Sequence, residues 1–466
     1  MRTLTALALV LASAPAAYAA GNLDNESFIQ QVGSDNSATV SQKKGNNNQA
    51  TVQAGQYNSV LSTQAGGKPG SNNSANVQTG TDNTALISQK DGNNNQGTFQ
   101  VGHANGVVTT QVSRLANGQN NSGNVQVGDY NAALTTQTNS APNPQATGVA
   151  YSNNAFSSQF GSGNTTSVTQ TGGQNNQAAI QGGIGNMSVL TQTDKAITPG
   201  SAAVVGGANT SFTAQFGDNN IVTTTQKTKD ASGTEGGFAN GYGNTSAAMQ
   251  YGTGNTATID QKGSAKAGEF SANPGVFNAS ATLQVGDANT VSVKQGGATS
   301  GNFGATTADQ AANDTNASFV GQYGVQNNAD INQKNGGNTQ ATFQTGHDNQ
   351  ATVTQKTQTL GTGNGTNNAL TAQFGANNKA TVAQAMAVPL SIGANNSFIS
   401  QVGGSNVVNA AQTTGQQAAA GNNTQVAFQA GYGNMATISQ ATGANVSNTS
   451  FTAQYGSHNT ATVSQK

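Results

Sequence analysis

The sequence predicts an all-β protein: a β-solenoid of about sixteen strand-turn-strand repeats that stack into a cross-β amyloid. Three observations support this fold class. One 18-residue pattern recurs sixteen times along the 466 residues, and the fixed polar residues within each half of it are separated by even numbers of residues. Charged residues make up only 7% of the chain and aromatic residues only 5%. The apolar content of 34% is thin for the conventional cores of the roughly three domains that the length suggests.

The composition excludes several classes of protein. The net charge of −1 argues against electrostatic capture of nucleic acid or of anionic lipid. Cysteine is absent, which excludes a disulfide framework and a cysteine-ligated metal or haem. The abundant Asn, Gln, Thr, Ser, Ala and Gly are typical either of aggregation-prone disorder or of stacked hydrogen-bonding ladders. Periodicity decides between these alternatives and favours the ladders.

The first twenty residues differ from the rest. Met1-Arg2 is followed by a short apolar run from Leu4 to Ala12 and by the small-x-small triplet Ala17-Tyr18-Ala19. These features predict a secretory signal peptide over residues 1–20, with a buried N-terminal helix as the alternative. The repeat domain is expected over residues 21–466. No later segment approaches 18 consecutive apolar residues, so no membrane span is expected and the mature protein is predicted to be secreted.

Each copy of the pattern keeps five residues. They are a first asparagine, a first glutamine six residues later, a glycine after two more, a second asparagine after three more and a second glutamine after six more. The repeats lie between residues 25 and 465. The first glutamines are Gln31, Gln53, Gln78, Gln100, Gln126, Gln159, Gln181, Gln215, Gln250, Gln284, Gln322, Gln344, Gln373, Gln401, Gln429 and Gln454.

The spacing within each half of a copy indicates a β-strand. Asn, a small residue and Gln are separated by two and then four residues, which places all three on one face of an extended strand. Thr, Val, Ile, Phe and Ser at the other positions suit strands. Between the halves, Gly can adopt positive φ and Asn tolerates left-handed geometry, so Gly-x-x-Asn predicts a tight turn. The pattern leaves open which face of the strands points inward.

Stacked copies would place Asn on Asn and Gln on Gln about 4.8 Å apart. Each amide could then donate to one neighbouring copy and accept from the other, a net gain of about 0.5–1.5 kcal/mol for each satisfied hydrogen bond. A polar core of this kind is stable only when fully paired, which explains the strictness of the pattern. The residues predicted to mediate stacking and self-assembly are Gln31, Gly33, Asn36, Gln42, Gln53, Asn58, Gln64, Gln78, Asn83, Gln89, Gln429, Asn434, Gln440, Gln454, Gly456, Asn459 and Gln465.

Insertions are predicted at one edge of the stack only. The distance from a copy's second glutamine to the next first glutamine is 11 residues in four cases and reaches 27 between Gln295 and Gln322. The segment from the glycine to the second asparagine never changes length. Extra residues therefore leave from the edge opposite the tight turns, as in other repeat solenoids.

No constellation of residues predicts catalysis or a cofactor. His103, His347 and His458 all fall in the tight turns and are interpreted as tolerated surface variation. Asp35, Asp82, Asp129, Asp218, Asp287 and Asp348 also lie there, too few in any one turn for the six or more oxygen ligands of calcium. Neither an enzyme, a metal site nor a cofactor site is expected.

The motif Gln-x-Gly-x-x-Asn-x-Ala-x-x-x-Gln, as in Gln78 to Gln89 and Gln454 to Gln465, resembles the repeat of curlin, the subunit of bacterial curli fibres. The resemblance spans residues 25 to 465. It implies a β-solenoid with one coil per repeat that self-assembles into extracellular amyloid for biofilm matrix and adhesion. It also implies a nucleator subunit and an outer-membrane secretion machinery as partners, besides the homopolymer itself.

The leading functional prediction is the major, polymerising structural subunit of such a fibre. A first alternative is the minor subunit that nucleates the fibre at the cell surface. A second is a monomeric β-solenoid that binds ice or carbohydrate, which should carry a Thr or aromatic ladder at one fixed position and a capped terminus. No single Thr position is filled in every copy, which favours the fibre subunit.

Overall fold

A computed structural model describes residues 25–66, 70–114, 118–139, 152–195, 208–229, 243–264, 278–296, 316–335, 337–357, 365–386, 393–415, 421–443 and 446–466. The predicted signal peptide, residues 1–20, lies outside these ranges. Among the described residues every regular element is a β-strand. None of them forms a helix with the length and apolar character needed to cross a membrane.

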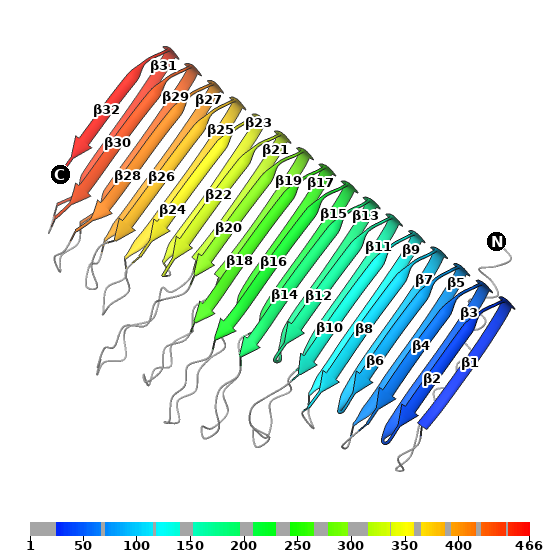
Figure 1. Ribbon diagram of the computed structural model, residues 1–466. Coiled ribbons are helices and arrows are strands. Elements are labelled where there is room, and N and C mark those ends of the chain that lie inside the picture. The colour runs from blue at the N-terminus through cyan, green and yellow to red at the C-terminus, as the bar shows by residue number, and fades with distance from the viewer. Residues whose placement is uncertain are drawn as a thin grey trace, which may run out of the picture.

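The chain forms two parallel sheets of sixteen strands each, as predicted for a β-solenoid. Odd-numbered strands make one sheet and even-numbered strands the other, so that each copy of the pattern is one coil with a strand in both sheets. Figure 1 shows the coils following one another in sequence order, with β1 at one end of the stack and β32 at the other.

The strands of the first sheet are β1 (Asn25–Ser34), β3 (Asn46–Gln56), β5 (Ser71–Thr81), β7 (Asn93–His103), β9 (Gln119–Asp129), β11 (Ser152–Ser162), β13 (Asn175–Ile184), β15 (Asn209–Asp218), β17 (Asn244–Thr253), β19 (Asn278–Asp287), β21 (Asn316–Val325), β23 (Asn338–His347), β25 (Thr366–Ala376), β27 (Ala394–Gly404), β29 (Asn423–Tyr432) and β31 (Asn448–Ser457).

The strands of the second sheet are β2 (Ser37–Lys43), β4 (Ser59–Ala65), β6 (Thr84–Lys90), β8 (Gly106–Ser113), β10 (Ala132–Asn139), β12 (Thr165–Thr171), β14 (Met187–Lys195), β16 (Ile221–Lys229), β18 (Thr256–Ser264), β20 (Thr290–Gly296), β22 (Asn328–Lys334), β24 (Gln350–Lys356), β26 (Lys379–Met386), β28 (Val407–Thr414), β30 (Met435–Thr442) and β32 (Thr460–Gln465).

The register between neighbouring coils follows the sequence pattern without a slip. Gln31 pairs with Gln53 and Gly33 with Gly55 between β1 and β3, and Gln42 pairs with Gln64 between β2 and β4. The same correspondence holds at the other end, where Gln429 pairs with Gln454. A one-residue slip would turn every amide to the opposite face, so the buried amides fix the register.

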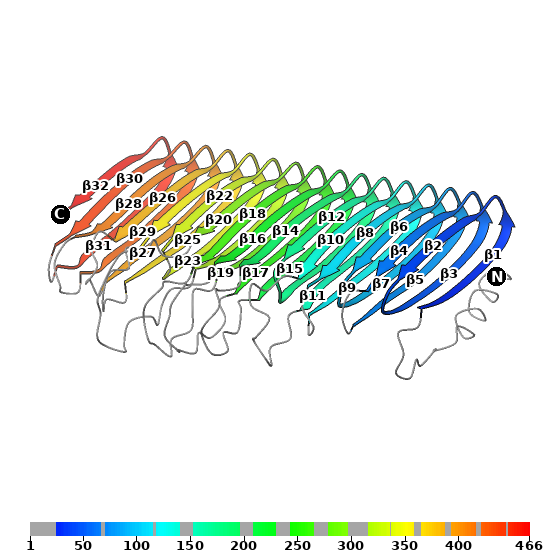
Figure 2. The same cartoon turned by 60° about the horizontal axis from the view of Figure 1, so that its bottom comes forward.

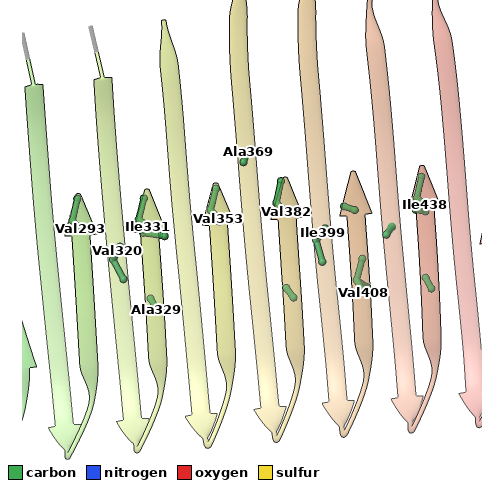
Figure 3. Packing of buried hydrophobic residues seen from close by; sticks show 14 of the residues in the cluster. Val293, Val320, Ala329, Ile331, Val353, Ala369, Val382, Ile399, Val408 and Ile438 are labelled. Carbon is green, nitrogen blue, oxygen red and sulfur yellow. The ribbon is translucent and has the colours of Figure 1, made fainter. Parts of the chain in front are cut away.

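The interior lies between the two sheets and combines amides with small and branched apolar residues. Burial alternates along most interior strands, so that the residues of even spacing face inward. In β11, β15 and β21 the outward Ser158, Ala214 and Gly321 are buried as well. Between the amide positions, residues such as Val320 and Ile399 from the odd strands meet Ile331 and Val382 from the even strands (Figure 3). These four side chains are at most 1% exposed. The sequence pattern did not decide which face of the strands points inward. In the structure, the face that carries the amides is the inner one.

The tight turn is shorter than expected, and its left-handed residue is not the predicted asparagine. Each odd strand continues past the glycine, which has a φ of 117° at Gly33. The next positive φ belongs to the residue before the second asparagine, such as Asp35 with 56° or Tyr57 with 56°. The second asparagine instead points inward, where its amide is bonded to neighbouring coils. Figure 2 shows these turns in a row along one edge of the solenoid.

The variable connections all join the end of an even strand to the start of the next odd strand, at the edge away from the tight turns. The shortest described connections of this kind have two residues and join β2, which ends at Lys43, to β3, and β6, which ends at Lys90, to β7. The tight turn itself has two residues outside the strands in every coil, as at residues 35 and 36. The predicted restriction of insertions to one edge therefore agrees with the order of the strands.

Candidate functional site

The first and second glutamines form two continuous ladders inside the solenoid. Gln31 Nε2 donates to Gln53 Oε1 at 2.7 Å, and Gln53 Nε2 donates to Gln78 Oε1 at 2.8 Å. The second glutamines repeat this arrangement, with 2.9 Å from Gln42 Nε2 to Gln64 Oε1. Every rung donates from a coil to the coil that follows it in the sequence. The ladders therefore have a direction, from the N-terminal coil to the C-terminal coil.

The same glutamines also hold the two sheets together. Gln53, in the first sheet, donates from Nε2 to the backbone carbonyl of Ser37 in the second sheet at 3.0 Å. Gln64, in the second sheet, donates to the carbonyl of Asn48 in the first sheet at 3.0 Å. One amide thus joins successive coils and also bridges the gap between the sheets. This double role requires a side chain that is long, neutral and able both to donate and to accept.

The second asparagines form a ladder of the opposite direction beside the tight turns. Asn58 Nδ2 donates back to Asn36 Oδ1 at 3.0 Å, and its backbone N–H donates to the same oxygen at 3.1 Å. Asn58 Nδ2 also donates forward to the carbonyl of Gly80 at 2.9 Å. The first asparagines likewise donate backward, from Asn47 Nδ2 to Asn25 Oδ1 at 2.6 Å. The ladders of the first and second asparagines therefore run in the opposite direction to the two glutamine ladders.

The invariant glycine is fixed by two separate constraints. Its φ, 123° at Gly55, lies in the region that favours glycine. In addition, a Cβ placed on Gly55 would lie 1.9 Å from the carbonyl oxygen of Gly80 in the next coil. That oxygen is the acceptor for Asn58 Nδ2. The glycine therefore permits both the turn and the close approach of the next coil.

Replacing an interior glycine with alanine is expected to unfold or separate the coils. In Gly346→Ala the new Cβ would lie 1.9 Å from the carbonyl oxygen of Gly375, at a φ of 118°. The left-handed backbone alone costs about 1–2 kcal/mol, before the clash is counted. The matched control is Gly97→Ala, because no atom lies within 4 Å of its Cβ. Urea denaturation should show a loss for Gly346→Ala only, and equal midpoints would contradict this account.

The predicted stacking residues lie at corresponding positions of the ladders, but the first and last coils differ from the interior. Gln53, Asn58, Gln64, Gln78 and Asn83 are 0% exposed. Gln89, Gln429, Asn434 and Gln440 are buried in the same way, with at most 1% exposed. In the first coil Gln31 and Gly33 are exposed, and Asn36 and Gln42 are half-buried.

In the last coil Gln454 is buried, Gln465 is half-buried, and Gly456 and Asn459 are exposed. Gln454 Nε2 donates only to the carbonyl of Met435, at 3.0 Å, where interior glutamines also donate to the next coil. Asn459 bonds back to Asn434 Oδ1 at 2.9 Å. Among the described residues, no following coil supplies an acceptor for Gln454 or donors for the Asn459 oxygen. Within the described part of the chain, the two glutamine ladders and the ladder of second asparagines stop at these two coils.

Two sets of residues that contribute to the stack are absent from the predicted set. The residues two before each first glutamine and two before each second glutamine are inward-facing, as Ile399 and Ile438 are. Their even distance from the glutamines is the signal that would have found them. In the turns, the carboxylates of Asp129, Asp218 and Asp287 accept hydrogen bonds from backbone N–H groups of the preceding coil, at 3.0 to 3.2 Å. For these carboxylates, only the three-dimensional structure identifies the backbone N–H groups that donate to them.

The turn histidines make local contacts. His103 Nδ1 lies 2.8 Å from Thr81 Oγ1 and 3.5 Å from a carboxylate oxygen of Asp82 in the preceding coil. His347 Nδ1 lies 3.2 Å from a carboxylate oxygen of its neighbour Asp348. Within the described ranges, no three His, Cys, Asp or Glu side chains gather closely enough to hold a metal ion.

Comparison with known families finds a match to a repeat family. The model of the curlin associated repeat matches residues 24–53, which span β1, β2 and most of β3. This segment contains the first complete coil and the first glutamine of the second. The five fixed positions of that coil recur at equivalent positions in the fifteen coils that follow. Comparison of the chain with curated proteins finds no match.

Proposed function

We propose that this curlin-repeat protein is a structural subunit that polymerises head to tail into an extracellular, curli-like amyloid fibre for biofilm matrix and adhesion. The observation that carries the proposal is that each ladder of fixed amides has one direction along the whole stack. Because each ladder has free donors at one end and free acceptors at the other, the two ends of the solenoid present complementary hydrogen-bonding groups. A second copy can continue every ladder without a change of register.

The last coil offers the donors that the first coil lacks. Gln454 Nε2 donates to the carbonyl of Met435 and Gln465 Nε2 to that of Thr449, as interior glutamines do, so the second hydrogen of each amide would be available to a following coil. Within the described part of the chain, no preceding coil donates to Gln31 Oε1 or Gln42 Oε1 in the first coil. In the opposite sense, Asn36 Nδ2 of the first coil can donate to Asn459 Oδ1 of the preceding molecule. Two copies joined last coil to first coil would therefore form the same rungs as the interior.

Contacts between two like ends do not satisfy these groups. Two first coils would bring the glutamine acceptors Gln31 and Gln42 against each other, and two last coils would oppose the donors of Gln454 and Gln465. The parallel, in-register strands also require that a following coil have the same strand direction. A head-to-tail contact does not close on itself, so it leads to a filament.

The proposal extends to export and assembly. The predicted signal peptide over residues 1–20 would direct the chain out of the cell, and the repeat domain from residue 21 would assemble at the cell surface. A nucleator subunit and an outer-membrane secretion machinery are the partners that the family resemblance suggests. The role of a major subunit is favoured over that of a nucleator because both end coils keep all five fixed residues.

A monomeric ice-binding or carbohydrate-binding solenoid is less well supported. Its ligand would require one regular ladder on a flat outer face. The outward position eight residues after the first glutamine holds Thr223 and Thr258 in two adjacent coils, but Leu61, Leu86 and Asp330 in others. The alternation of residue types along that line does not favour an ordered lattice of ligand groups.

The chain from residue 21 onward is expected to form fibres in the absence of any partner. Strands stacked along the fibre axis should give fibre-diffraction spacings near about 4.8 Å along the axis and about 10 Å across the sheets. Negative-stain microscopy of the purified protein, with and without dissociation in formic acid, supplies the second readout. A protein that remains monomeric for days at high concentration would refute the proposed function.

A further inference from the structure

The two outer faces of the solenoid have very different chemistry. We define the aromatic face as the outward residues of the odd strands three and one before, and one after, each first glutamine. No charged residue occupies any of these positions. Every phenylalanine among the described residues lies on this face. They are Phe28, Phe99, Phe156, Phe160, Phe212, Phe216, Phe319, Phe343, Phe374, Phe398, Phe428 and Phe451.

The outward residues of the even strands form the opposite surface, which we call the threonine face. It comprises the residues six, eight and ten after each first glutamine, and more than half of these are Thr or Ser. It has no aromatic residue and carries Asp260, Lys294, Asp330 and Lys379. Both faces are built on the same coils, so the segregation of aromatic residues is not a consequence of the fold.

The aromatic face is large enough for a stable protein interface. Phe374 is 44% exposed and Phe398 39% exposed, although both lie in interior coils. Sixteen coils at about 4.8 Å give a length of about 70 Å, and four residues along the strand give a width of about 13 Å. Two such faces in contact would bury about 2,000 Å² in total, within the range of specific interfaces. Exposed apolar patches of this size mark interaction sites.

The aromatic face has a trough in its N-terminal part and a ridge in its C-terminal part. Three residues before the first glutamine, β3, β5, β7 and β9 have Ala50, Ala75, Gly97 and Gly123, whereas β25, β27 and β29 have Leu370, Phe398 and Val426. A groove of about 860 Å³ follows the small residues between Phe28 and Phe156. One wall of the groove is a ladder of asparagines on the outer side of the sheet, in which Asn73 Nδ2 donates to Asn95 Oδ1 at 2.9 Å.

We propose that two solenoids pack aromatic face to aromatic face with antiparallel axes, so that the ridge of each copy lies in the trough of the other. A two-fold axis parallel to the strands places the first coil opposite the last, the second opposite the fifteenth, and so on. Ala75 then faces Phe398 of the second copy, and Gly97 faces its Leu370. Near the centre Phe156 faces Phe319, with Ser158 and Gly321 leaving room beside the rings.

The parallel alternative packs poorly. A two-fold axis along the solenoid would place each coil opposite its equivalent and would reverse the strand direction. Phe156 would then face Phe160, and Phe319 would face Tyr323. In the trough Ala50 would face Ala54, so the groove would stay empty. Rings meet in the antiparallel pair as well, where Phe160 would face Tyr323, but there the ridge fills the groove. Because an unfilled cavity costs stability, the antiparallel arrangement is selected. Lateral pairing uses a different surface from head-to-tail growth, and it does not depend on the proposed fibre function.

Disulfide cross-linking distinguishes these arrangements, because the chain has no cysteine of its own. In the antiparallel pair Thr79 faces Val402 of the second copy, whereas in the parallel pair it faces Ala75. Mixtures of Thr79→Cys with Val402→Cys, and of Thr79→Cys with Ala75→Cys, are oxidised by air. Only the first mixture is expected to give heterodimers. In head-to-tail contact, the cysteines of the first mixture would be five coils, or about 24 Å, apart, beyond the limit of about 7 Å between Cα atoms for a disulfide.

A matched pair of substitutions tests the face directly. Gly97 on the aromatic face and Gly106 on the threonine face belong to the same coil, and no atom lies within 4 Å of a Cβ at either position. Gly97→Glu would place an unpaired carboxylate in the lateral interface, whereas Gly106→Glu leaves it in water. We expect the yield of heterodimer from the mixture of Thr79→Cys with Val402→Cys to fall at least about tenfold for Gly97→Glu only, since a 1.4 kcal/mol penalty is already a factor of about ten.

Axial growth is measured separately, from the fibre length and the meridional diffraction spacing. Lateral pairing is overturned if neither cysteine mixture cross-links, if only Thr79→Cys with Ala75→Cys does, or if Gly97→Glu and Gly106→Glu behave alike. Fibres that are single but of normal length would refute the lateral pairing and leave the proposed function intact. Cross-linked dimers without fibres would refute the proposed function and leave the lateral pairing intact.

Discussion

Alanine at Gln454 and Asn459 is expected to slow fibre elongation by at least about tenfold. These residues lie in the last coil, where Gln454 Nε2 and Asn459 Oδ1 would form rungs with the first coil of the next molecule. Removing them leaves Gln31 Oε1 without its donor and Asn36 Nδ2 without its acceptor in the buried contact. An unmatched buried amide costs about 1–3 kcal/mol. Seeded growth curves at matched protein concentration measure the effect.

The control is the same pair of substitutions in a central coil. Gln250 and Asn255 are 0% exposed and are bonded on both sides within one chain, with 2.7 Å from Gln250 Nε2 to Gln284 Oε1. Gln250→Ala with Asn255→Ala should lower the free energy of unfolding, while the other fifteen coils keep the register of the stack. Elongation that slows as much or more in this central variant would show that the chain ends are not the growth surfaces.

Inserting three residues between Gly324 and Asn327 is expected to prevent normal stacking. The two-residue turn fixes the position of Asn327, and Gln326 in this turn has a φ of 57°. Its backbone N–H donates to Asn289 Oδ1 at 3.1 Å and its Nδ2 donates to the carbonyl of Gly346 at 3.0 Å. A longer turn would move the amide away from both neighbouring coils. The loss of these bonds should cost several kcal/mol, at about 1–3 kcal/mol each.

Shortening the opposite edge of the same coil is the matched control. The segment between Gly296 at the end of β20 and Asn316 at the start of β21 can be cut to three residues. That is the length by which β22 and β23 are joined, between Lys334 and Asn338. Because the entropic cost of loop closure changes slowly with length, assembly should be unaffected. Thioflavin fluorescence and electron microscopy of both variants provide the comparison, and equal tolerance at the two edges would refute the one-edge model.

Several features of the stack could be predicted from the sequence because they are one-dimensional. The fixed spacing from Gln31 to Gln42 specifies one coil, and its recurrence specifies the number of coils and the pairing of equivalent residues. The constant length of Gly-x-x-Asn and the variable length elsewhere specify the edge where insertions leave. None of these conclusions requires a side-chain direction or a distance between coils.

The left-handed turn residue could not be assigned in the same way. In twelve coils it is an ordinary residue, such as Tyr57 or Ala104, and in the others it is glycine. Its conformation is imposed by the ladders on both sides of the turn. The sequence analysis assigned the second asparagine to the turn because asparagine tolerates left-handed geometry. In the structure its position is fixed instead by its hydrogen bonds to the preceding and following coils.

By itself, the sequence determined a solenoid of sixteen in-register coils, since amides repeated at fixed intervals satisfy one another only when equivalent coils are neighbours. The tertiary structure decided which strand face is inside. It placed Gln53 and Asn58 in the interior and Phe374 and Phe398 outside, the reverse of an ordinary hydrophobic pattern. It also decided the direction of each ladder, forward for the glutamines and backward for the first and second asparagines, because rotamers and contacts between coils, not residue spacing, select which amide donates. From these directions follow the complementary ends, and from the outward aromatic residues follows a separate lateral surface.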